Sequence, residues 1–348
     1  MAQLRSQTEQ IKARAKSLGF SIVGITHTEP LQEHGRYKEW ISKQYHAGMK
    51  YLATPYHIDT RRDPRLLLPN AQSVIVVGFT YPLHSIDILS PLPVGVISSY
   101  AAGEDYHDYI PRLLEQFVQS VRSDFGQEIA ARICTDSAPI LERELAQRAG
   151  LGWIGKNSCL ISPQIGSALL LAEVLLDLKL EIDPPFQHDY CGTCNRCVLA
   201  CPTGCIQNDR TIDANRCISY QTIENRGEIP PELMHQSGNW IFGCDVCQMV
   251  CPWNKKRITT FGQANKELIV SVDQMTELLT ISEQAFQQQF GSTALARTKR
   301  NGLLRNLLIR LGNLANSETI PAIQRLIDST SDPVLLHTAQ WALERMDK

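Results

Sequence analysis

The spacing of apolar positions divides the chain into three stretches of different character. In the first, runs rich in β-branched residues alternate with segments whose apolar positions recur every three or four residues. These patterns predict strands at 21–26, 73–79, 95–100 and 130–134, and helices at 3–17, 111–122 and 139–149. The last two helices would open on a proline, which the first helical position accepts. Such interleaving predicts a mixed sheet-and-helix domain of α/β or α+β class over residues 1–180.

The two remaining stretches differ from the first and from each other. Residues 181–257 have few long periodic segments and many cysteines, so we expect bound metal to hold this part together. Residues 275–348 are predicted to be helical, with apolar positions three or four apart at 302–311, 320–327 and 334–346. Helices of this length and spacing suit a HEAT-like repeat, and a plain three-helix cap equally well.

Composition places the chain among globular proteins. Apolar residues make up 43% and charged residues 20% of its 348 residues, which excludes disordered and fibrous classes. No apolar run approaches the roughly 18 residues of a membrane helix, and the polar N-terminus lacks the apolar core of a secretory signal. We therefore expect a cytoplasmic protein with no membrane partner. Nothing in the sequence demands more than a monomer.

The cysteines carry the clearest chemical signal. There are 11 of them, and in a reducing compartment crowded cysteines are more often metal ligands than disulfides. The run Cys191-x2-Cys194-x2-Cys197-x3-Cys201-Pro202 has the spacing with which bacterial ferredoxins hold 4Fe–4S clusters. In that arrangement three thiolates serve one cluster and the fourth serves its neighbour.

A second cysteine run has the same ending but lacks its first member. Ile241 stands where a complete copy would have a cysteine, so Cys217, between the runs, is predicted to supply the missing thiolate. The first cluster then takes Cys191, Cys194, Cys197 and Cys251, and the second takes Cys201, Cys217, Cys244 and Cys247. The structural thiols that remain are Cys134, Cys159 and Cys205. Structural zinc on the CxxC pairs is the alternative to iron.

Two adjacent clusters form an electron path, which needs an acceptor in the first 180 residues. A phosphate-binding GxxxxGK[ST] loop is absent, and the glycines of GLGWIGK at 150–156 follow a predicted helix, which disfavours a nucleotide site. Asp136 is a better candidate for chemistry, because it follows an apolar strand and precedes a predicted helix. A helix cap or a surface turn is the alternative role for this residue.

Several segments, in their order along the chain, resemble the epoxyqueuosine reductase family. They are RRDP at 61–64, GEDYHDY at 103–109, CTDSAPILER at 134–143, AGLGWIGKNS at 149–158, RCISYQTIE at 216–224 and GCDVCQMVCPWN at 243–254. The resemblance extends from about residue 2 to the C-terminus. It implies an oxidoreductase that reduces epoxyqueuosine to queuosine at the wobble position of tRNA anticodons of the Asp, Asn, His and Tyr type. Two 4Fe–4S clusters would pass electrons from an unidentified low-potential donor to cobalamin.

The resemblance also assigns roles to segments and residues. Residues 1–180 would bind cobalamin and carry catalysis, 181–257 would form a ferredoxin-like double-cluster domain, and 275–348 would contact tRNA. Asp136 would be the general acid, its pKa raised by the apolar macrocycle. The cofactor contacts would be Arg61, Ser98, Asp136, Asn157, Ser158, Leu160, Ser219, Cys244 and Asp245. A serine is no soft ligand, so cobalt ligation from position 98 is not implied.

Other functional classes share part of this pattern. A reductive dehalogenase-like enzyme also combines cobalamin with two clusters, and a ferredoxin-type electron carrier would need only the clusters. The segment GEDYHDY begins like the DxHxxG motif of histidine-ligated cobalamin proteins, but Ile110 replaces the glycine, so His107 is not assigned as a cobalt ligand. The stretch of about 180 residues before the clusters favours an enzyme over a carrier.

The basic residues are unevenly placed, although the net charge is only −2. No acidic residue occurs between Glu283 and Glu318. Five basic residues fall in this gap: Arg297, Lys299, Arg300, Arg305 and Arg310. A further basic run, 255–257, follows the last cluster cysteine. Together they predict a phosphate-binding platform for the anticodon arm, with a solvated basic face as the alternative.

Overall fold

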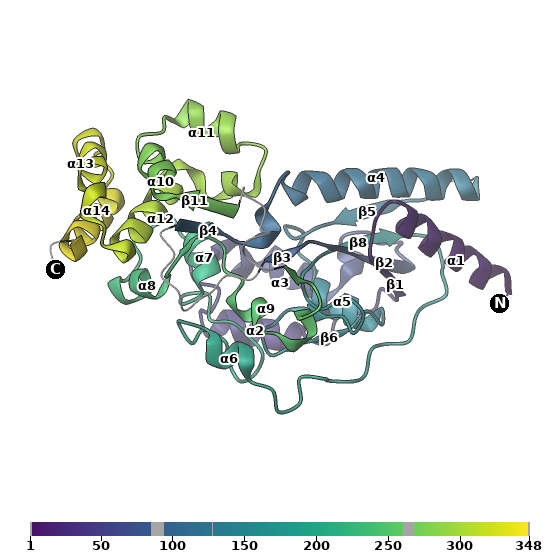
Figure 1. Ribbon diagram of the computed structural model, residues 1–348. Helices are drawn as coiled ribbons and strands as arrows, with labels where there is room; N and C mark the ends of the chain where they lie inside the picture. Colours follow the sequence, from purple (N-terminus) through teal and green to yellow (C-terminus); the bar gives the residue numbers. More distant parts are fainter. Residues whose placement is uncertain (1, 85–93, 127, 260–267, 347–348) are drawn as a thin grey trace.

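The computed structural model describes residues 2–84, 94–126, 128–259 and 268–346. An antiparallel four-stranded sheet, in the order β1-β2-β8-β5, organises the first half of the chain (Figure 1). Its strands are β1 (Ile22–Thr26), β2 (Ser73–Thr80), β5 (Ala131–Cys134) and β8 (Leu169–Leu176). The helices α1 (Ala2–Ser17) and α4 (Tyr106–Phe125) cover one face, and α5 (Glu142–Arg148) covers the other. The predicted mixture of helices and strands is confirmed for this stretch.

The position of strand β2 in the sheet explains why its sequence is an unbroken apolar run. Successive side chains of a strand point to opposite faces, so Ile75 and Val77 pack with α1 and α4. Val74 and Val76 pack on the other face with α5. Because helices lie on both faces, neither set of side chains can be polar.

Three predicted elements have other boundaries, and one strand was missed: the strand predicted at 95–100 ends at Ile97, and two helices begin elsewhere. Helix α4 begins at Tyr106, and Pro111 lies inside it, because the Asp105 side chain caps the helix by accepting from the His107 backbone N–H at 3.0 Å. Helix α5 begins only at Glu142, after a turn. The sequence patterns did not predict β8, whose apolar run is interrupted by the buried Glu173.

A three-stranded sheet joins the first two stretches of the chain to the segment that precedes the third. Strand β4 (Val94–Ile97) pairs in parallel with β9 (Trp240–Phe242) and antiparallel with β11 (Ile269–Ser271). A smaller pair joins β3 (Leu83–His84) to β10 (Ile258–Thr259). The first two predicted segments therefore share backbone pairing, and the connection that leads to the third is paired with the first.

Short elements surround these sheets. In the first half they are α2 (His34–Ser42), α3 (Pro55–Arg62), β6 (Trp153–Ile154) and β7 (Leu160–Ile161). The cysteine-rich stretch contributes α6 (Arg196–Ala200), α7 (Ile218–Ile223), α8 (Pro231–Gln236) and α9 (Val246–Met249). Helices α6 and α9 contact each other, which brings the two cysteine runs together below the sheets in Figure 1.

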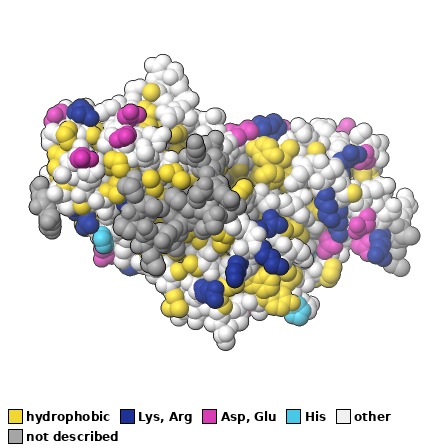
Figure 2. Space-filling view, in the orientation of Figure 1, with side chains coloured by type: hydrophobic (Ala, Val, Ile, Leu, Met, Phe, Trp, Pro, Cys, Tyr) yellow, Lys and Arg dark blue, Asp and Glu magenta, His cyan; other side chains and the backbone are white. Residues whose placement is uncertain are grey.

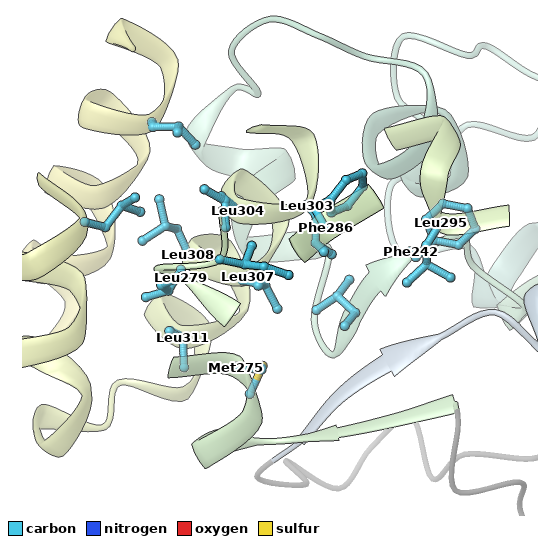
Figure 3. Packing of buried hydrophobic residues seen from close by; sticks show 14 of the residues in the cluster. Phe242, Met275, Leu279, Phe286, Leu295, Leu303, Leu304, Leu307, Leu308 and Leu311 are labelled. Atoms are coloured by element: carbon cyan, nitrogen blue, oxygen red, sulfur yellow. The ribbon is translucent and has the colours of Figure 1, made fainter. Parts of the chain in front are cut away.

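The C-terminal stretch is helical, as predicted. It contains α10 (Val272–Leu278), α11 (Glu283–Phe290), α12 (Lys299–Leu314), α13 (Ile320–Ser329) and α14 (Pro333–Met346). Helix α12 is the centre of the largest core, where Leu303, Leu304 and Leu307 meet Phe242 from β9 and Met275 from α10 (Figure 3). The HEAT-like character of these helices stays a prediction. Within the described residues, no helix has the length and apolar character needed to span a membrane.

Candidate active site and cluster-binding segment

Four cysteines from both runs line a single cavity. Cys191 and Cys194 precede α6, Cys197 lies within it, and Cys251 follows α9. All four border a cavity of about 510 Å³. The Trp153 indole N–H donates to Cys191 Sγ at 3.4 Å, which holds the cysteine loop against β6. The structure thus brings together the four residues expected to hold the first cluster.

Four thiols around one cavity are the donor set that a 4Fe–4S cluster uses. A zinc ion needs its ligands within about 2.3 Å of a single point. No three His, Cys, Asp or Glu side chains of the described chain gather closely enough for that. A 4Fe–4S cube instead attaches each thiolate to a different iron, so its ligands lie farther apart.

The predicted ligands of the second cluster lie near one another, and a further cysteine, Cys205, lies among them. Cys244 and Cys247 lie at the start of α9, and Cys217 precedes α7. Cys201 Sγ lies 3.4 Å from Cys205 Sγ, and Cys205 also bonds the Cys217 thiol. Cys205, which the sequence left as a structural thiol, therefore lies among the predicted ligands.

Asp245 ties the cluster-binding segment to β4. Its carboxylate accepts from Ser98 Oγ at 2.5 Å and from the Ser99 backbone N–H at 2.6 Å. Gly243 permits this approach, because a Cβ there would lie 2.4 Å from Ser98 Cβ, and its φ is +68°. Ser98 and Asp245, both predicted cofactor contacts, are thus bonded to each other, and this bond fixes Cys244 beside β4.

Asp136 lies at the end of β5 with its backbone in the left-handed region, at φ 46°, which is uncommon for a residue other than glycine. Its backbone N–H donates to Glu142 Oε1 at 2.6 Å. Its Oδ2 accepts from His107 Nε2 at 2.9 Å and from Arg297 Nη1 at 3.0 Å. The side chain is still 45% exposed. The carboxylate is therefore held from one side and open on the other.

These neighbours decide where the protons are. Burial alone would raise the pKa of Asp136, but the His107 bond and the Arg297 charge lower it below its ordinary value. Burial and the nearby Asp136 charge raise the pKa of Glu142. Burial opposes protonation of His107, yet its bonds to Asp105 and Asp136 raise the pKa of His107 to about 9. In the chain alone, two cationic groups therefore hold the pKa of Asp136 below its ordinary value, and the rise expected beside the apolar macrocycle stays a prediction.

Three residues of this site were missed by the sequence analysis. His107 and Glu142 lie in segments that carried the family resemblance, so their motifs were visible without their roles. The His107 ring is held by Asp105, whose Oδ1 is 2.6 Å from Nδ1. Arg297 was assigned to a tRNA surface, but the structure places it against His107 and Asp136. Only the folded chain brings these residues together.

Arg61 belongs to the same site. It lies in the last turn of α3, is 7% exposed, and bonds His57 Nδ1 at 2.7 Å. Burial lowers the pKa of Arg61, and the negative charges of Glu142 and Asp136 partly oppose this shift by favouring the charged guanidinium. This guanidinium therefore lies within electrostatic reach of both carboxylates.

The β6–β7 hairpin carries a further group of predicted cofactor contacts. Asn157 is 2% exposed, and its Nδ2 has no hydrogen-bond partner among the described residues. Ser158 accepts from Arg143 at 2.6 Å in a left-handed conformation, and Leu160 is buried. An unpaired buried amide donor is costly, so this hairpin fits a bound group rich in acceptor oxygens. Ser219, the remaining predicted contact, is half-buried in α7.

Some residues of the predicted phosphate-binding platform are exposed, and others are buried. Lys299 is exposed and Arg300 is partly exposed, so both can meet RNA. Arg305 and Arg310 are only 1% and 3% exposed. The Arg305 guanidinium donates at 2.6–2.9 Å to the backbone oxygens of Gln221, Asn225 and Gly227. The prediction of Arg305 as a tRNA contact is wrong, because α12 is enclosed on nearly all sides.

Arg305→Glu is expected to destabilise the fold rather than to weaken RNA binding selectively. The new carboxylate would face three carbonyl oxygens in a buried site, and breaking such a buried charged network costs about 3–5 kcal/mol. Thermal or denaturant unfolding measures the loss. Lys299→Glu, on the surface of the same helix, is the matched control and should leave the free energy of unfolding within about 0.5 kcal/mol. Equal unfolding midpoints for the two variants would contradict the interior role.

The fold and the site together define an oxidoreductase with a double iron–sulfur segment and a titratable centre in its N-terminal half. The family described as "Epoxyqueuosine reductase QueG, DUF1730" matches residues 61–137, and that described as "4Fe-4S double cluster binding domain" matches residues 190–254. Epoxyqueuosine reductases of Cyclobacterium marinum and Escherichia coli are 40% and 38% identical to the chain. These alignments cover 88% and 91% of this chain, and 97% and 84% of the relatives. The chain belongs to the epoxyqueuosine reductase family.

Solved structures agree with this membership. A crystal structure of epoxyqueuosine reductase with an epoxyqueuosine-modified tRNA-Tyr stem loop matches with a TM-score of 0.88 at 29% identity. That match covers 98% of this chain and 90% of the other. The Streptococcus thermophilus epoxyqueuosine reductase gives a TM-score of 0.87 at 28% identity, covering 97% and 90%. The similarity therefore includes all three stretches of the chain.

Proposed function

We propose that this protein reduces epoxyqueuosine to queuosine at the wobble position of tRNA. The observation that carries the proposal is the His107–Asp136–Glu142 group, which is open to solvent on one side and stands in the same fold as two assembled cysteine sets. Relatives named epoxyqueuosine reductase support the reaction. The structural relative with a modified tRNA-Tyr stem loop supports the substrate, and anticodons of the Asp, Asn and His type complete the proposed set.

Cobalamin is the proposed electron acceptor, held between Arg61, the β6–β7 hairpin and α7. The unpaired Asn157 Nδ2 and the unpaired Thr135 Oγ1, next to Asp136, are buried polar atoms that suit a large ligand with many amide and phosphate oxygens. When bound, cobalamin supplies a strongly reducing cobalt centre, and the clusters supply its electrons. Ser98 and Asp245 contribute by fixing Cys244, and with it the second cysteine set, beside β4.

The protein residues supply and hold protons. Converting an epoxide to an alkene and water consumes two electrons and two protons, and the departing oxygen needs an acid near neutral pH. His107, which bonds the Asp136 carboxylate, holds a proton at that pH, and burial raises the pKa of Glu142, which bonds the Asp136 backbone N–H, to about 7. Asp136, with its exposed carboxylate, passes a proton from His107 Nε2 to the oxygen. A Bacillus subtilis epoxyqueuosine reductase with its catalytic aspartate loop swung out of the active site supports a reactive aspartate on this loop.

The pH dependence of turnover should report His107. Its raised pKa means that the protonated form, and the stabilisation from its two carboxylate partners, is fully present below about 6.5 and is lost as the pH rises through about 9. Turnover should therefore fall about tenfold in total between pH 8 and 10, as His107 loses its proton. His107→Gln keeps a donor to Asp136 but cannot titrate, so its profile should lose this limb. An unchanged limb in that variant would assign the titration to another group.

The direct test of the proposed function is anaerobic reconstitution with iron, sulfide and cobalamin, followed by nucleoside analysis. The reconstituted protein is incubated with dithionite-reduced methyl viologen and tRNA carrying epoxyqueuosine. Mass spectrometry of the digested tRNA should show the loss of one oxygen atom and the appearance of queuosine. Unchanged epoxyqueuosine, with both cofactors verified by absorption, would overturn the proposal.

A further inference from the structure

The cavity bordered by the first cysteine set opens on a face rich in cations. Its lining includes Lys156, Arg196, Lys256 and Arg257, and it includes no aspartate or glutamate. Figure 2 shows dark-blue side chains scattered over the part of the molecule where α6 and α9 lie in Figure 1, beside yellow apolar surface. Positive charge therefore surrounds the entrance to the four thiols.

These cations have no ion-pair partner among the described residues, although the Asp189 carboxylate lies within electrostatic reach of Lys156. Within the described chain, no ion pair involves Arg196, Lys256 or Arg257. In the described part of the chain, Lys156 donates to the uncharged oxygens of Gly192 and Asn195, each at 2.8 Å. Asp189, the acidic residue closest in sequence to the cysteine loop, forms an ion pair with Arg210. The net charge of this face is positive even though that of the whole chain is slightly negative.

An apolar groove adjoins the cationic cavity. It has a volume of about 570 Å³ and shares Arg196, Cys251 and Pro252 with the first cavity. Its apolar lining includes Leu199, Met249, Val250 and Ile258. Leu199 is 83% exposed, and Tyr190 and Trp253, at the neighbouring cavity, are 49% and 36% exposed. Such exposure of large apolar side chains on one face marks an interaction site.

The combination favours a protein over RNA. Protein interfaces have an apolar centre enriched in Met, aromatic residues and Arg, and a polar rim. RNA phosphates would pair with Arg196 and Lys256 but would leave Leu199 and Met249 uncovered. The carrier that fits must bring negative charge around a small apolar patch, and it must come close to the first cluster, because electron transfer slows steeply with distance.

We propose that this face, defined by Lys156, Arg196, Leu199, Trp253, Lys256 and Arg257, is the docking site of a small acidic one-electron carrier protein. This inference rests on the proposed function. At each docking the carrier is oxidised by one electron and the first cluster is reduced by one electron. Two dockings therefore deliver the two electrons that the reduction of one epoxide consumes. Electron-transfer encounters use small interfaces, and opposite charges steer them together at rates that fall with ionic strength.

The experiment compares reduction of the clusters by two donors in the reconstituted full chain. An acidic plant-type ferredoxin, reduced beforehand, is the protein donor, and dithionite-reduced methyl viologen is the small donor that needs no docking surface. Stopped-flow bleaching of the iron–sulfur absorption gives the rate without any tRNA. The variants are Arg196→Glu and Leu199→Ser, and the control is Arg325→Glu, an exposed charge reversal on the distant α13.

In Arg196→Glu, the second-order rate with ferredoxin should fall about 10-fold or more. In Leu199→Ser, dissociation should quicken and the rate should also fall. Both variants should keep wild-type iron content, their rates with methyl viologen should equal that of Arg325→Glu, and their tRNA affinity should equal that of the wild type. Ferredoxin rates equal to the control would overturn the docking site. Weakened tRNA binding with unchanged ferredoxin rates would assign the face to RNA instead.

If the proposed function is wrong but the docking site is right, the experiments give a different pattern. The cluster-reduction rates would remain as expected, while methyl viologen would not support conversion of epoxyqueuosine by the wild-type protein. The two ideas can therefore fail independently.

Discussion

Asp136→Asn should turn over epoxyqueuosine tRNA about 10²–10⁴-fold more slowly than the wild type, the usual contribution of a positioned acid. The amide keeps the size of the carboxylate and can still bond Arg297 or His107 through its oxygen, but it cannot relay a proton from His107 Nε2. Single-turnover formation of queuosine, measured after cofactor content has been matched, gives the rate.

The matched control for this variant is Asp108→Asn. Asp108 lies one residue beyond His107 in α4, is exposed, and should leave turnover within about twofold of wild type. A rate near that of wild type for Asp136→Asn would remove the relay. Loss of cobalamin from the variant would show instead that Asp136 holds the cofactor.

Cys251→Ala should abolish the first cluster, although Cys251 belongs to the second cysteine run. The four thiols around the cavity come from both runs, so removing Cys251 leaves only three ligands for that cube. Iron content should fall from about eight to about four atoms per chain, and conversion of epoxyqueuosine with a protein donor should cease. Iron and sulfide analysis of anaerobically reconstituted protein measures the loss.

Two further thiols provide the comparison for the cluster assignment. Cys134→Ala removes a buried thiol on β5 and should keep all of the iron. Cys205 is the sharper case, because it bonds Cys201 and Cys217. If Cys205→Ala loses iron and Cys217→Ala keeps it, the division of ligands proposed for the second cluster is wrong.

The cysteine spacing and the helical periodicity could be read from the sequence because both are local. Ligand geometry needs thiols two or three residues apart, and α12 to α14 need apolar positions three or four apart. The strand before Asp136 was equally visible. These features depend on neighbours within a few residues, which the sequence lists directly.

The charge state of Asp136 and the burial of Arg305 depend on distant residues. Arg297 reaches Asp136 across 161 positions, and Arg305 donates to carbonyl groups about 80 positions away. A basic run identifies charge but not the direction in which each side chain points. The same limit explains why β4 could be predicted while its pairing with β9 and β11 could not.

The pairing of β4 has a consequence for the order of biosynthesis. Its two neighbours end at Phe242 and Ser271, so a nascent chain emerging from the ribosome cannot complete this sheet until most of its length has been translated. Until then β4 presents unpaired backbone groups, which invite association with other chains. Because Cys251 is a predicted ligand of the first cluster, that cluster cannot be complete before translation has passed residue 251, and a chain that ends before Ser271 would leave this edge of β4 uncovered.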